Sequence, residues 1–130
     1  MRQTDPIKIL GLDLGSEQKA KILDFSKVLL QWNKRTNLIS KSDEARVFSR
    51  HIMDSLAATS FLVGNKVVDI GSGAGLPGLP LAIACPQKKF TLCDRMKKRT
   101  HFMRFVIANL GIDNVQVIEA PFEEIVSSVS

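Results

Sequence analysis

The stretch VVDIGSGAGLPG, residues 67–78, decides the fold and contains two overlapping cofactor motifs. An apolar, β-rich run is followed directly by a glycine-rich turn. Starting at Gly73, the letters fit G-x-G-x-x-G, which is typical of dinucleotide-binding proteins. Starting at Asp69, they fit D-x-G-x-G-x-G, which is typical of pockets for methyl donors. In a parallel sheet, the loop after the first strand meets the ligand, so either motif predicts a cofactor beside these glycines, and a purely structural turn is the alternative.

The sequence after Gly64 predicts alternating strands and helices. Three compact runs are expected to be strands, namely KVVDI (66–70), FTLCD (90–94) and NVQVIEA (114–120). Residues 95–111 are expected to form a helix that ends at Gly111. Its apolar stripe consists of Phe102, Met103, Val106 and Leu110. This order predicts right-handed crossovers and a partial parallel sheet of the α/β class, with three legible strands.

The sequence before Gly64 has helical rather than strand periodicity. An amphipathic helix is expected to begin after an N-cap at Ser16. Its apolar positions are Ile22, Phe25, Leu29 and Trp32. A second helix is expected over residues 42–62, capped by Ser42 and with Phe48, Ile52 and Leu56 at steps of four. We therefore predict an N-terminal helical arm, 1–65, followed by an α/β domain, 66–130.

Residues near the loop favour a methyl donor over a dinucleotide. Pro77 and Pro80 remove two N–H donors near the helix start that a pyrophosphate would need. Asp69 would repel that anion, but it would attract the cationic sulfonium of S-adenosylmethionine. Asp94, which ends the second strand, is expected to accept hydrogen bonds from a ribose, and a helix-capping role is its alternative.

Composition and charge restrict the class of protein. The chain has 130 residues, 45% of them hydrophobic, and a net charge of +5. Residues 95–104 contain five Lys or Arg and no acid, which predicts either a polyanionic partner or a solvated helix face. No apolar run is long enough for a membrane span, and no secretory signal is visible, so we expect a cytoplasmic protein. Cys85 and Cys93 lack metal-ligand spacing, so we expect reduced thiols and no metal site.

Four motifs, in order and spacing, resemble one bacterial enzyme family. They are WNKRTNLIS (32–40), RHIMDSL (50–56), VVDIGSGAGLPGLPLAI (67–83) and FTLCDRMKKRTHFM (90–103). The chain resembles, from Trp32 to about Ile125, the RsmG family of 16S ribosomal RNA guanine-N7 methyltransferases, also called glucose-inhibited division protein B. The core G-S-G-A-G-L-P-G-x-P-L is highly specific for that family.

The resemblance implies a Rossmann-like methyltransferase fold, with 66–130 as the N-terminal half of that domain, and S-adenosylmethionine as the cofactor. It also implies a guanine in a loop of 16S RNA, in the small ribosomal subunit, as the target. By resemblance, cofactor contacts fall on Gly71, Leu76, Phe122 and Glu123. The motif itself adds Asp69, Gly73, Gly75 and Asp94. At Pro121 the chain departs from the family, which usually has a basic residue there. Because guanine N7 carries a lone pair and no proton, the reaction needs no general base, and we assign no catalytic residue.

Four residues are candidates for contacts with RNA. Arg50 and His51 lie together on the second predicted helix, near Asp54, although a packed or capping histidine is the alternative. Lys97 and Arg104 share one face of the predicted helix 95–111 with His101, and a solvated face is the alternative.

The sheet of this family has seven strands, and only three strands can be recognised in this sequence. We therefore predict a C-terminally truncated chain with half of the cofactor site and an open edge at residues 67–70. Such a chain is expected to bind S-adenosylmethionine weakly and to associate through that edge. Two other classes stay open: a noncatalytic RNA-binding remnant of the fold and, less favoured, a dinucleotide-dependent oxidoreductase.

Overall fold

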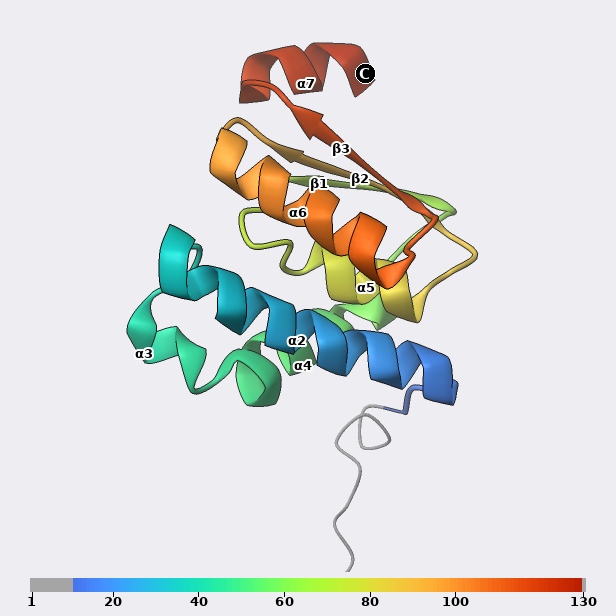
Figure 1. The fold of residues 1–130 in the computed structure, drawn as a ribbon. Coiled ribbons are helices and arrows are strands. Elements are labelled where there is room, and N and C mark those ends of the chain that lie inside the picture. The colour runs from blue at the N-terminus through green and yellow to red at the C-terminus, as the bar shows by residue number, and fades with distance from the viewer. Residues whose placement is uncertain (1–10, 130) are drawn as a thin grey trace, which may run out of the picture.

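A three-stranded parallel sheet forms the centre of the computed structural model, which describes residues 11–129 (Figure 1). Its strands, hydrogen-bonded in this order, are β1 (Lys66–Ile70), β2 (Lys89–Asp94) and β3 (Val115–Glu119). In the register, Val67 lies beside Phe90, and Phe90 lies beside Val115. The predicted α/β class with a partial parallel sheet is confirmed, and each predicted run contains a strand.

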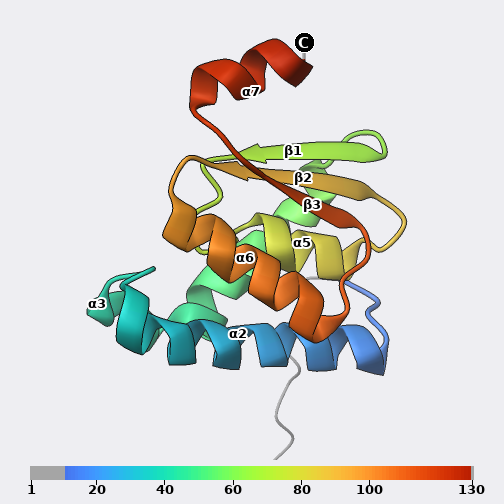
Figure 2. The same ribbon diagram turned by 45° about the horizontal axis from the view of Figure 1, so that its top comes forward.

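Three helices accompany the strands, two on one face of the sheet and one on the other. They are α5 (Gly78–Ala84), α6 (Lys97–Leu110) and α7 (Phe122–Val129). Figure 2 shows α5 and α6 together below the sheet and α7 beyond its opposite face. Three members of the predicted stripe of α6 are buried, Phe102, Met103 and Val106, and Leu110 is partly buried. The helix is capped by Gly111, which has a φ of 66°. Both crossovers of the predicted strand–helix alternation are thus present.

The N-terminal half is helical, and its longest helix is α2 (Ser16–Thr36). The predicted apolar stripe is confirmed, with these members fully buried: Ile22, Phe25 and Leu29. The prediction that Ser16 caps α2 is wrong. Gly15 occupies the N-cap position, and its N–H donates to Oε1 of Gln18 at 2.8 Å. This bond is the half of a capping box that the N3 residue supplies, and glycine has no side chain to supply the other half. No helix within residues 11–129 is long and apolar enough to cross a membrane.

The segment expected as one helix over residues 42–62 forms four short helical pieces. They are α3 (Lys41–Glu44), the π-helix η1 (Val47–Ile52), α4 (Met53–Ala57) and the 3-10 helix η2 (Ala58–Phe61). On an ideal α-helix, apolar residues at steps of four drift by about 40° per step. Of the predicted apolar positions, Ile52 and Leu56 are buried but Phe48 is only partly buried, and Val47 is buried in its place. The five-residue step from Val47 to Ile52 matches the wider π turn. The prediction that Ser42 is the cap is also wrong, because the Ser40 hydroxyl accepts the N–H of Asp43 at 3.2 Å.

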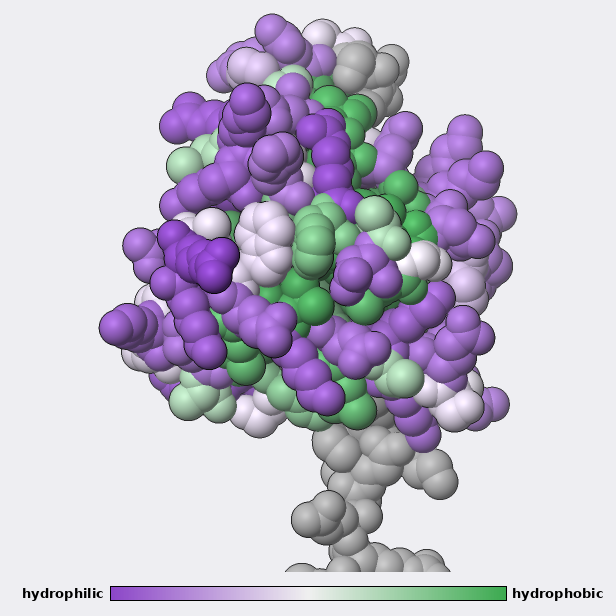
Figure 3. All heavy atoms as spheres, in the orientation of Figure 1, coloured by the Kyte–Doolittle hydropathy of each residue, from purple (hydrophilic) through white to green (hydrophobic). Residues whose placement is uncertain are grey.

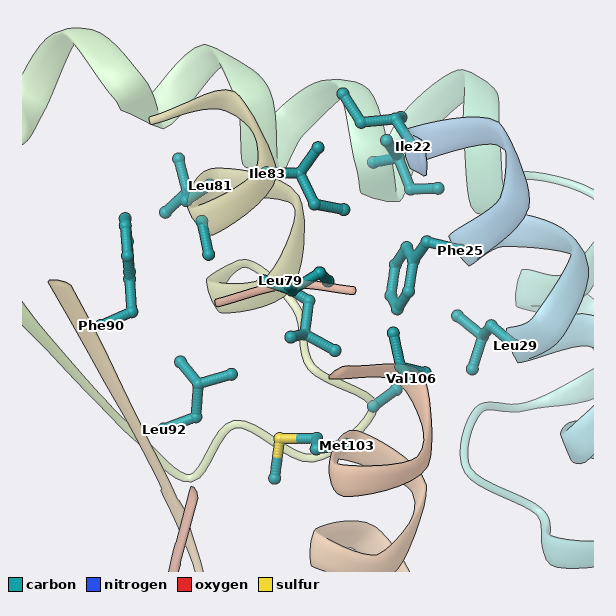
Figure 4. Close-up of a cluster of buried hydrophobic side chains, with 14 of the residues drawn as sticks. Ile22, Phe25, Leu29, Leu79, Leu81, Ile83, Phe90, Leu92, Met103 and Val106 are labelled. Atoms are coloured by element: carbon teal, nitrogen blue, oxygen red, sulfur yellow. The ribbon is translucent and has the colours of Figure 1, made fainter. Parts of the chain in front are cut away.

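One hydrophobic core joins the N-terminal helices to the sheet (Figure 4). Phe25 of α2, Leu79 of α5, Leu92 of β2 and Met103 of α6 all point into it, and none of them is exposed. The ring centroids of Phe25 and Phe102 are 6.3 Å apart. Burying such side chains stabilises the fold by roughly 1.5–3 kcal/mol each. The core therefore crosses residue 65, which separates the two predicted units.

β1 is an edge strand of the described sheet, because β2 is its only strand partner there. On the face away from α5 and α6, Val68 is 44% exposed and Ile70 is 40% exposed. The predicted open edge at residues 67–70 is thus present. Unpaired backbone groups on such an edge are able to accept another strand.

Candidate functional site

The loop after β1 holds three glycines in the left-handed backbone region. Gly71, Gly73 and Gly75 have φ angles of 78°, 55° and 80°, where a side chain would be strained. The N–H groups of Gly71 and Ser72 both donate to the carbonyl oxygen of Cys93, at 2.8 and 3.0 Å. The loop therefore crosses the carboxyl end of β2, which is where ligands bind in open parallel sheets.

The glycines of this segment serve different physical purposes. A Cβ on Gly71 would meet no atom within 4 Å, so the backbone there is open to approach from outside. A Cβ on Gly75 would collide with the side chain of Leu79, and one on Gly78 would collide with Leu92. Gly71 thus suits close contact with a ligand, whereas Gly75 and Gly78 allow α5 to pack tightly on the loop and the sheet.

Asp94, the last residue of β2, joins the glycine loop to the start of α6. Its Oδ2 accepts the N–H of Gly73 at 2.9 Å, and its Oδ1 accepts the N–H of Met96 at 2.9 Å. Nη1 of Arg99 lies 3.6 Å from Oδ2. Met96 holds the N-cap position of α6, so Asp94 accepts an N–H at the helix start without being the cap residue. Each carboxylate oxygen keeps a lone pair for a further donor, such as a ribose hydroxyl.

Asp69 lies under the glycine loop and against the start of α5. Its Oδ2 is 2.8 Å from the position that a Cβ of Gly78 would take. No hydrogen bond of good geometry reaches this atom from a described residue. Burial raises the pKa of Asp69, and the charge of Asp94 raises it further, although Ser72 and Gly78 offset part of the rise. Asp69 is therefore a largely buried acid that the surrounding groups satisfy incompletely.

A hollow of about 250 Å³ opens beside the loop at the carboxyl ends of the strands. It is lined by Ile70, Gly71, Cys93, Asp94, Arg95, Arg99, Ala120, Phe122 and Ile125. Three predicted cofactor residues meet in it: Gly71, Asp94 and Phe122. The other predicted residues do not line it: Asp69, Gly73, Gly75, Leu76 and Glu123. Ligand pockets usually measure roughly 300–1,000 Å³, so this hollow is large enough for only part of a nucleoside cofactor.

The residues of the hollow fit a ribose-containing cofactor. Asp94 offers a buried acceptor, Gly71 leaves the backbone bare, and Phe122, 57% exposed, offers apolar surface. Arg99 also lines the hollow, and its Nε is buried without a hydrogen bond from a described residue. The sequence interpretation missed Arg99 because it belongs to the basic run 95–104. Only its contact with Asp94 distinguishes it from its neighbours.

Arg50 and His51 lie on η1, and each contacts an acid. Nε of Arg50 is 4.0 Å from Oδ2 of Asp54, and Nε2 of His51 is 3.2 Å from Oδ1 of Asp43. The pKa of Asp43 is lowered, chiefly by its hydrogen bond with Ser40 and then by that with His51. The sequence placed His51 near Asp54, but its partner is Asp43. His51 is thus held in the fold while keeping about a third of its side chain exposed.

Lys97, His101 and Arg104 lie on the exposed side of α6, as predicted. Nη2 of Arg104 donates to the carbonyl oxygen of Val117 at 3.2 Å, and its Nη1 is 4.0 Å from Oε1 of Glu119. Within the described chain, neither Lys97 nor His101 forms an ion pair. Arg104 therefore fastens α6 to β3, whereas the charge of Lys97 is available to a partner.

The cysteines and other ligating side chains form no metal centre in the described chain. Between residues 11 and 129, no group of three His, Cys, Asp or Glu could hold a metal ion. Cys85 and Cys93 are buried free thiols, and burial raises the pKa of both.

Comparison with known proteins gives a consistent result. A family model described as rRNA small subunit methyltransferase G matches residues 18–129. A protein of Shewanella piezotolerans named ribosomal RNA small subunit methyltransferase G is 45% identical over 114 residues, which cover 88% of this chain and 55% of that protein. Proteins of the same name from Alteromonas mediterranea and Psychromonas ingrahamii are 41% and 40% identical over 114 residues, covering 88% of this chain and 54% and 55% of their own lengths. The chain spans about half the length of these curated relatives. It belongs to the rRNA small subunit methyltransferase G family.

Proposed function

We propose that this protein transfers a methyl group from S-adenosylmethionine to N7 of a guanine in a loop of 16S ribosomal RNA. Membership in the family and the name shared by its relatives support the reaction class. The observation that carries the proposal is the contact between Asp94 and Gly73, which presents a buried carboxylate beside open glycine backbone.

Each predicted cofactor residue receives a role in this proposal. Asp94 accepts a ribose hydroxyl, Gly71 lets the cofactor approach the main chain, and Phe122 covers an apolar part of it. Gly73 and Gly75 shape the loop. Leu76 and Glu123 are proposed contacts that lie outside the described hollow. Asp69 contributes a negative charge beneath the loop, which favours a cation there over a pyrophosphate.

The chemistry asks the protein for placement rather than for proton transfer. S-adenosylmethionine supplies a methyl group on a positively charged sulfur. Guanine N7 attacks through its lone pair and loses no proton, so alignment is the main requirement. The residues of this chain bind and orient the cofactor, and no residue is assigned to an acid–base step.

Arg50, His51, Lys97 and Arg104 are the proposed RNA contacts. Lys97 is the strongest of them because no described residue pairs with its charge. Arg50, His51 and Arg104 would have to share their existing partners with phosphate. The remaining proposals are a helical arm over 1–65, a methyltransferase half-domain over 66–130, and the cytoplasm, where ribosomal RNA is modified, as the compartment.

Calorimetric titration of the 130-residue chain with S-adenosylmethionine tests the cofactor site. We expect weak binding that Asp94→Asn abolishes, because the amide removes the charge and one acceptor. Asp113→Asn is the matched control, since Asp113 is an exposed acid outside the hollow. Unchanged affinity in Asp94→Asn would contradict the proposed site. Tight binding by the wild-type chain would contradict the expected weak binding.

Transfer of a tritiated methyl group to small ribosomal subunits tests the reaction separately. Label at N7 of a guanine is the expected product. RNA binding with neither cofactor binding nor transfer would favour the second candidate, a noncatalytic RNA-binding protein. The small size of the hollow beside Asp94 supports this candidate.

A further inference from the structure

A second hollow, which shares no lining residue with the hollow beside Asp94, lies at the C-terminal end of α2. It measures about 590 Å³ and is more than twice the volume of the hollow beside Asp94. Its described lining consists of Gln31, Trp32, Lys34, Arg35 and Thr36. The proposed cofactor chemistry uses none of these residues.

Trp32 is the aromatic residue among those that line this hollow. Its ring centroid is 5.5 Å from that of Phe102 at an interplanar angle of 64°, and 5.1 Å from that of Phe105 at 44°. Phe102 is fully buried, so the contacts from α6 fix the indole in one orientation. Trp32 remains half-buried and Phe105 is 43% exposed, so aromatic surface reaches solvent. Figure 3 shows pale and green side chains between α6 and α2 with purple side chains around them.

The charge around this aromatic surface is positive. Lys34 and Arg35 are exposed, and neither forms an ion pair with a described residue. The described lining contains no acid. Basic residues in a last helical turn are common because they complement the helix dipole. Trp32 packs part of its ring against the core, and its exposed part lies beside these cations. The combination of stacking surface with cations is typical of single-stranded nucleic acid sites.

The hollow lies at the same end of the molecule as the glycine loop. Figures 1 and 2 show the end of α2 and the carboxyl ends of the strands on the same side. α6 connects the two places, because it starts at Lys97 beside Asp94 and contacts Trp32 through Phe105. Eight residues of helix span about 12 Å. Stacked nucleotides at roughly 3.4 Å each would cover that span in three or four steps.

We propose that the α2 hollow holds an unpaired nucleotide of the RNA substrate, next to the segment that enters the cofactor site. The base stacks on Trp32, and Lys34 and Arg35 contact the adjoining phosphates. The inference rests on the proposed function, since that function supplies the RNA. The hollow prefers unpaired RNA over a duplex, because a paired base cannot offer its face to an indole.

Tryptophan fluorescence tests the proposal directly, because Trp32 is the only tryptophan of the chain. The chain is titrated with a single-stranded RNA oligonucleotide and with a duplex of the same sequence. We expect quenching by the single strand and little by the duplex. Single-strand binding without a change in fluorescence, equal quenching by both, or no RNA binding would each overturn the proposal.

Substitutions identify the residues that act. Lys34→Ala and Arg35→Ala should each weaken single-strand binding several-fold and lower the salt slope by about one. Lys66→Ala is the control, because Lys66 is an exposed lysine at the N-terminal end of β1 and does not line the hollow. It should change neither the affinity for the single strand nor the salt slope. Trp32→Leu should weaken binding about tenfold, measured by the polarisation of labelled RNA. Equal effects of Lys34→Ala and Lys66→Ala would contradict the proposal.

The cofactor titration separates this inference from the proposed function. Lys34→Ala and Arg35→Ala should leave S-adenosylmethionine affinity unchanged. If the cofactor binds normally while Trp32 fails to respond to RNA, only the hollow proposal fails. If the cofactor fails to bind while RNA quenches Trp32, only the methyltransferase proposal fails.

Discussion

Gly73 donates its backbone N–H to the carboxylate of Asp94 across 2.9 Å, which fastens the loop after β1 to the end of β2. The same carboxylate accepts the N–H of Met96, so one side chain fixes two segments that the sequence separates by about twenty residues. A binding loop held in this way requires little reordering when a ligand arrives.

Replacing Asp94 should therefore weaken the fold as well as the site. Asp94→Asn keeps one acceptor oxygen but loses the other and the charge that faces Arg99. We expect the free energy of unfolding to fall by about 1–3 kcal/mol, because a buried N–H loses its partner. Urea denaturation measures the change, and Asp113→Asn should leave the midpoint where it is.

Gly78→Ala should destabilise the protein by steric collision. The added Cβ would collide with Leu92 and come within 2.8 Å of Oδ2 of Asp69. Overpacking of this kind costs about 1–3 kcal/mol. Gly15→Ala is the comparison, since a Cβ there meets only Oε1 of Gln18, at 3.5 Å, and only the preference of an N-cap for glycine over alanine is lost. Equal thermal midpoints for the two variants would contradict the packing described for α5.

The buried carboxyl of Asp69 should make stability depend on pH. Its pKa is raised in the folded state above 3.8, so the folded protein holds this proton more tightly than the unfolded chain does. This group's contribution to the free energy of unfolding therefore falls as pH rises from about 3.8 through the raised pKa, and then stays constant. Asp69→Asn should remove that fall. Urea denaturation of the wild type and of Asp69→Asn across this pH range should show a difference in the free energy of unfolding that grows with pH. A constant difference would contradict the raised pKa of Asp69.

Asn33 should matter for stability although it carries no charge. It is 4% exposed; its amide donates to Oε1 of Glu44 at 2.7 Å, and its Oδ1 accepts the N–H of Ile39 at 2.8 Å. Asn33→Ala leaves the N–H of Ile39 without that partner, and we expect a loss of about 1–3 kcal/mol in denaturation. Asn109→Ala, at an exposed position of α6, should cost nothing.

The open edge of β1 should promote association. Sedimentation at increasing concentration should show self-association that Val68→Lys reduces, because lysine on an edge strand opposes pairing. Phe61→Ser is the comparison, since Phe61 is 81% exposed and lies outside the sheet. If Phe61→Ser reduces association and Val68→Lys does not, general hydrophobic contact and not the edge is responsible.

The strands and α6 could be predicted because local pattern and tertiary structure agree there. Phe102, Met103 and Val106 are spaced for a helix and are buried in one. The region around η1 could not be predicted, since the steps of four between Phe48, Ile52 and Leu56 also suit an α-helix approximately. Neither helix cap could be predicted, because a glycine stands at the N-cap of α2, and because Ser40 and Ser42 are equally suitable residue types for the start of α3.

The site could be predicted only where a motif fixed the backbone. The glycines and Asp94 follow from spacing along the chain. The contact of Arg99 with Asp94 and that of His51 with Asp43 depend on how helices pack, which periodicity does not encode. The position of Asp69 beneath the loop also depends on tertiary packing, so periodicity does not predict it.

The core shared by α2 and α6 also bears on how the chain is made. The apolar face of α2 leaves the ribosome first, but Phe102, Met103 and Val106, against which it packs, are synthesised much later. An amphipathic helix gains most of its stability from the packing of its apolar face. η1 and α5, which are made earlier, also contact α2, but its apolar face is completely covered only when α6 emerges, and a chaperone would be most useful to the protein before that point.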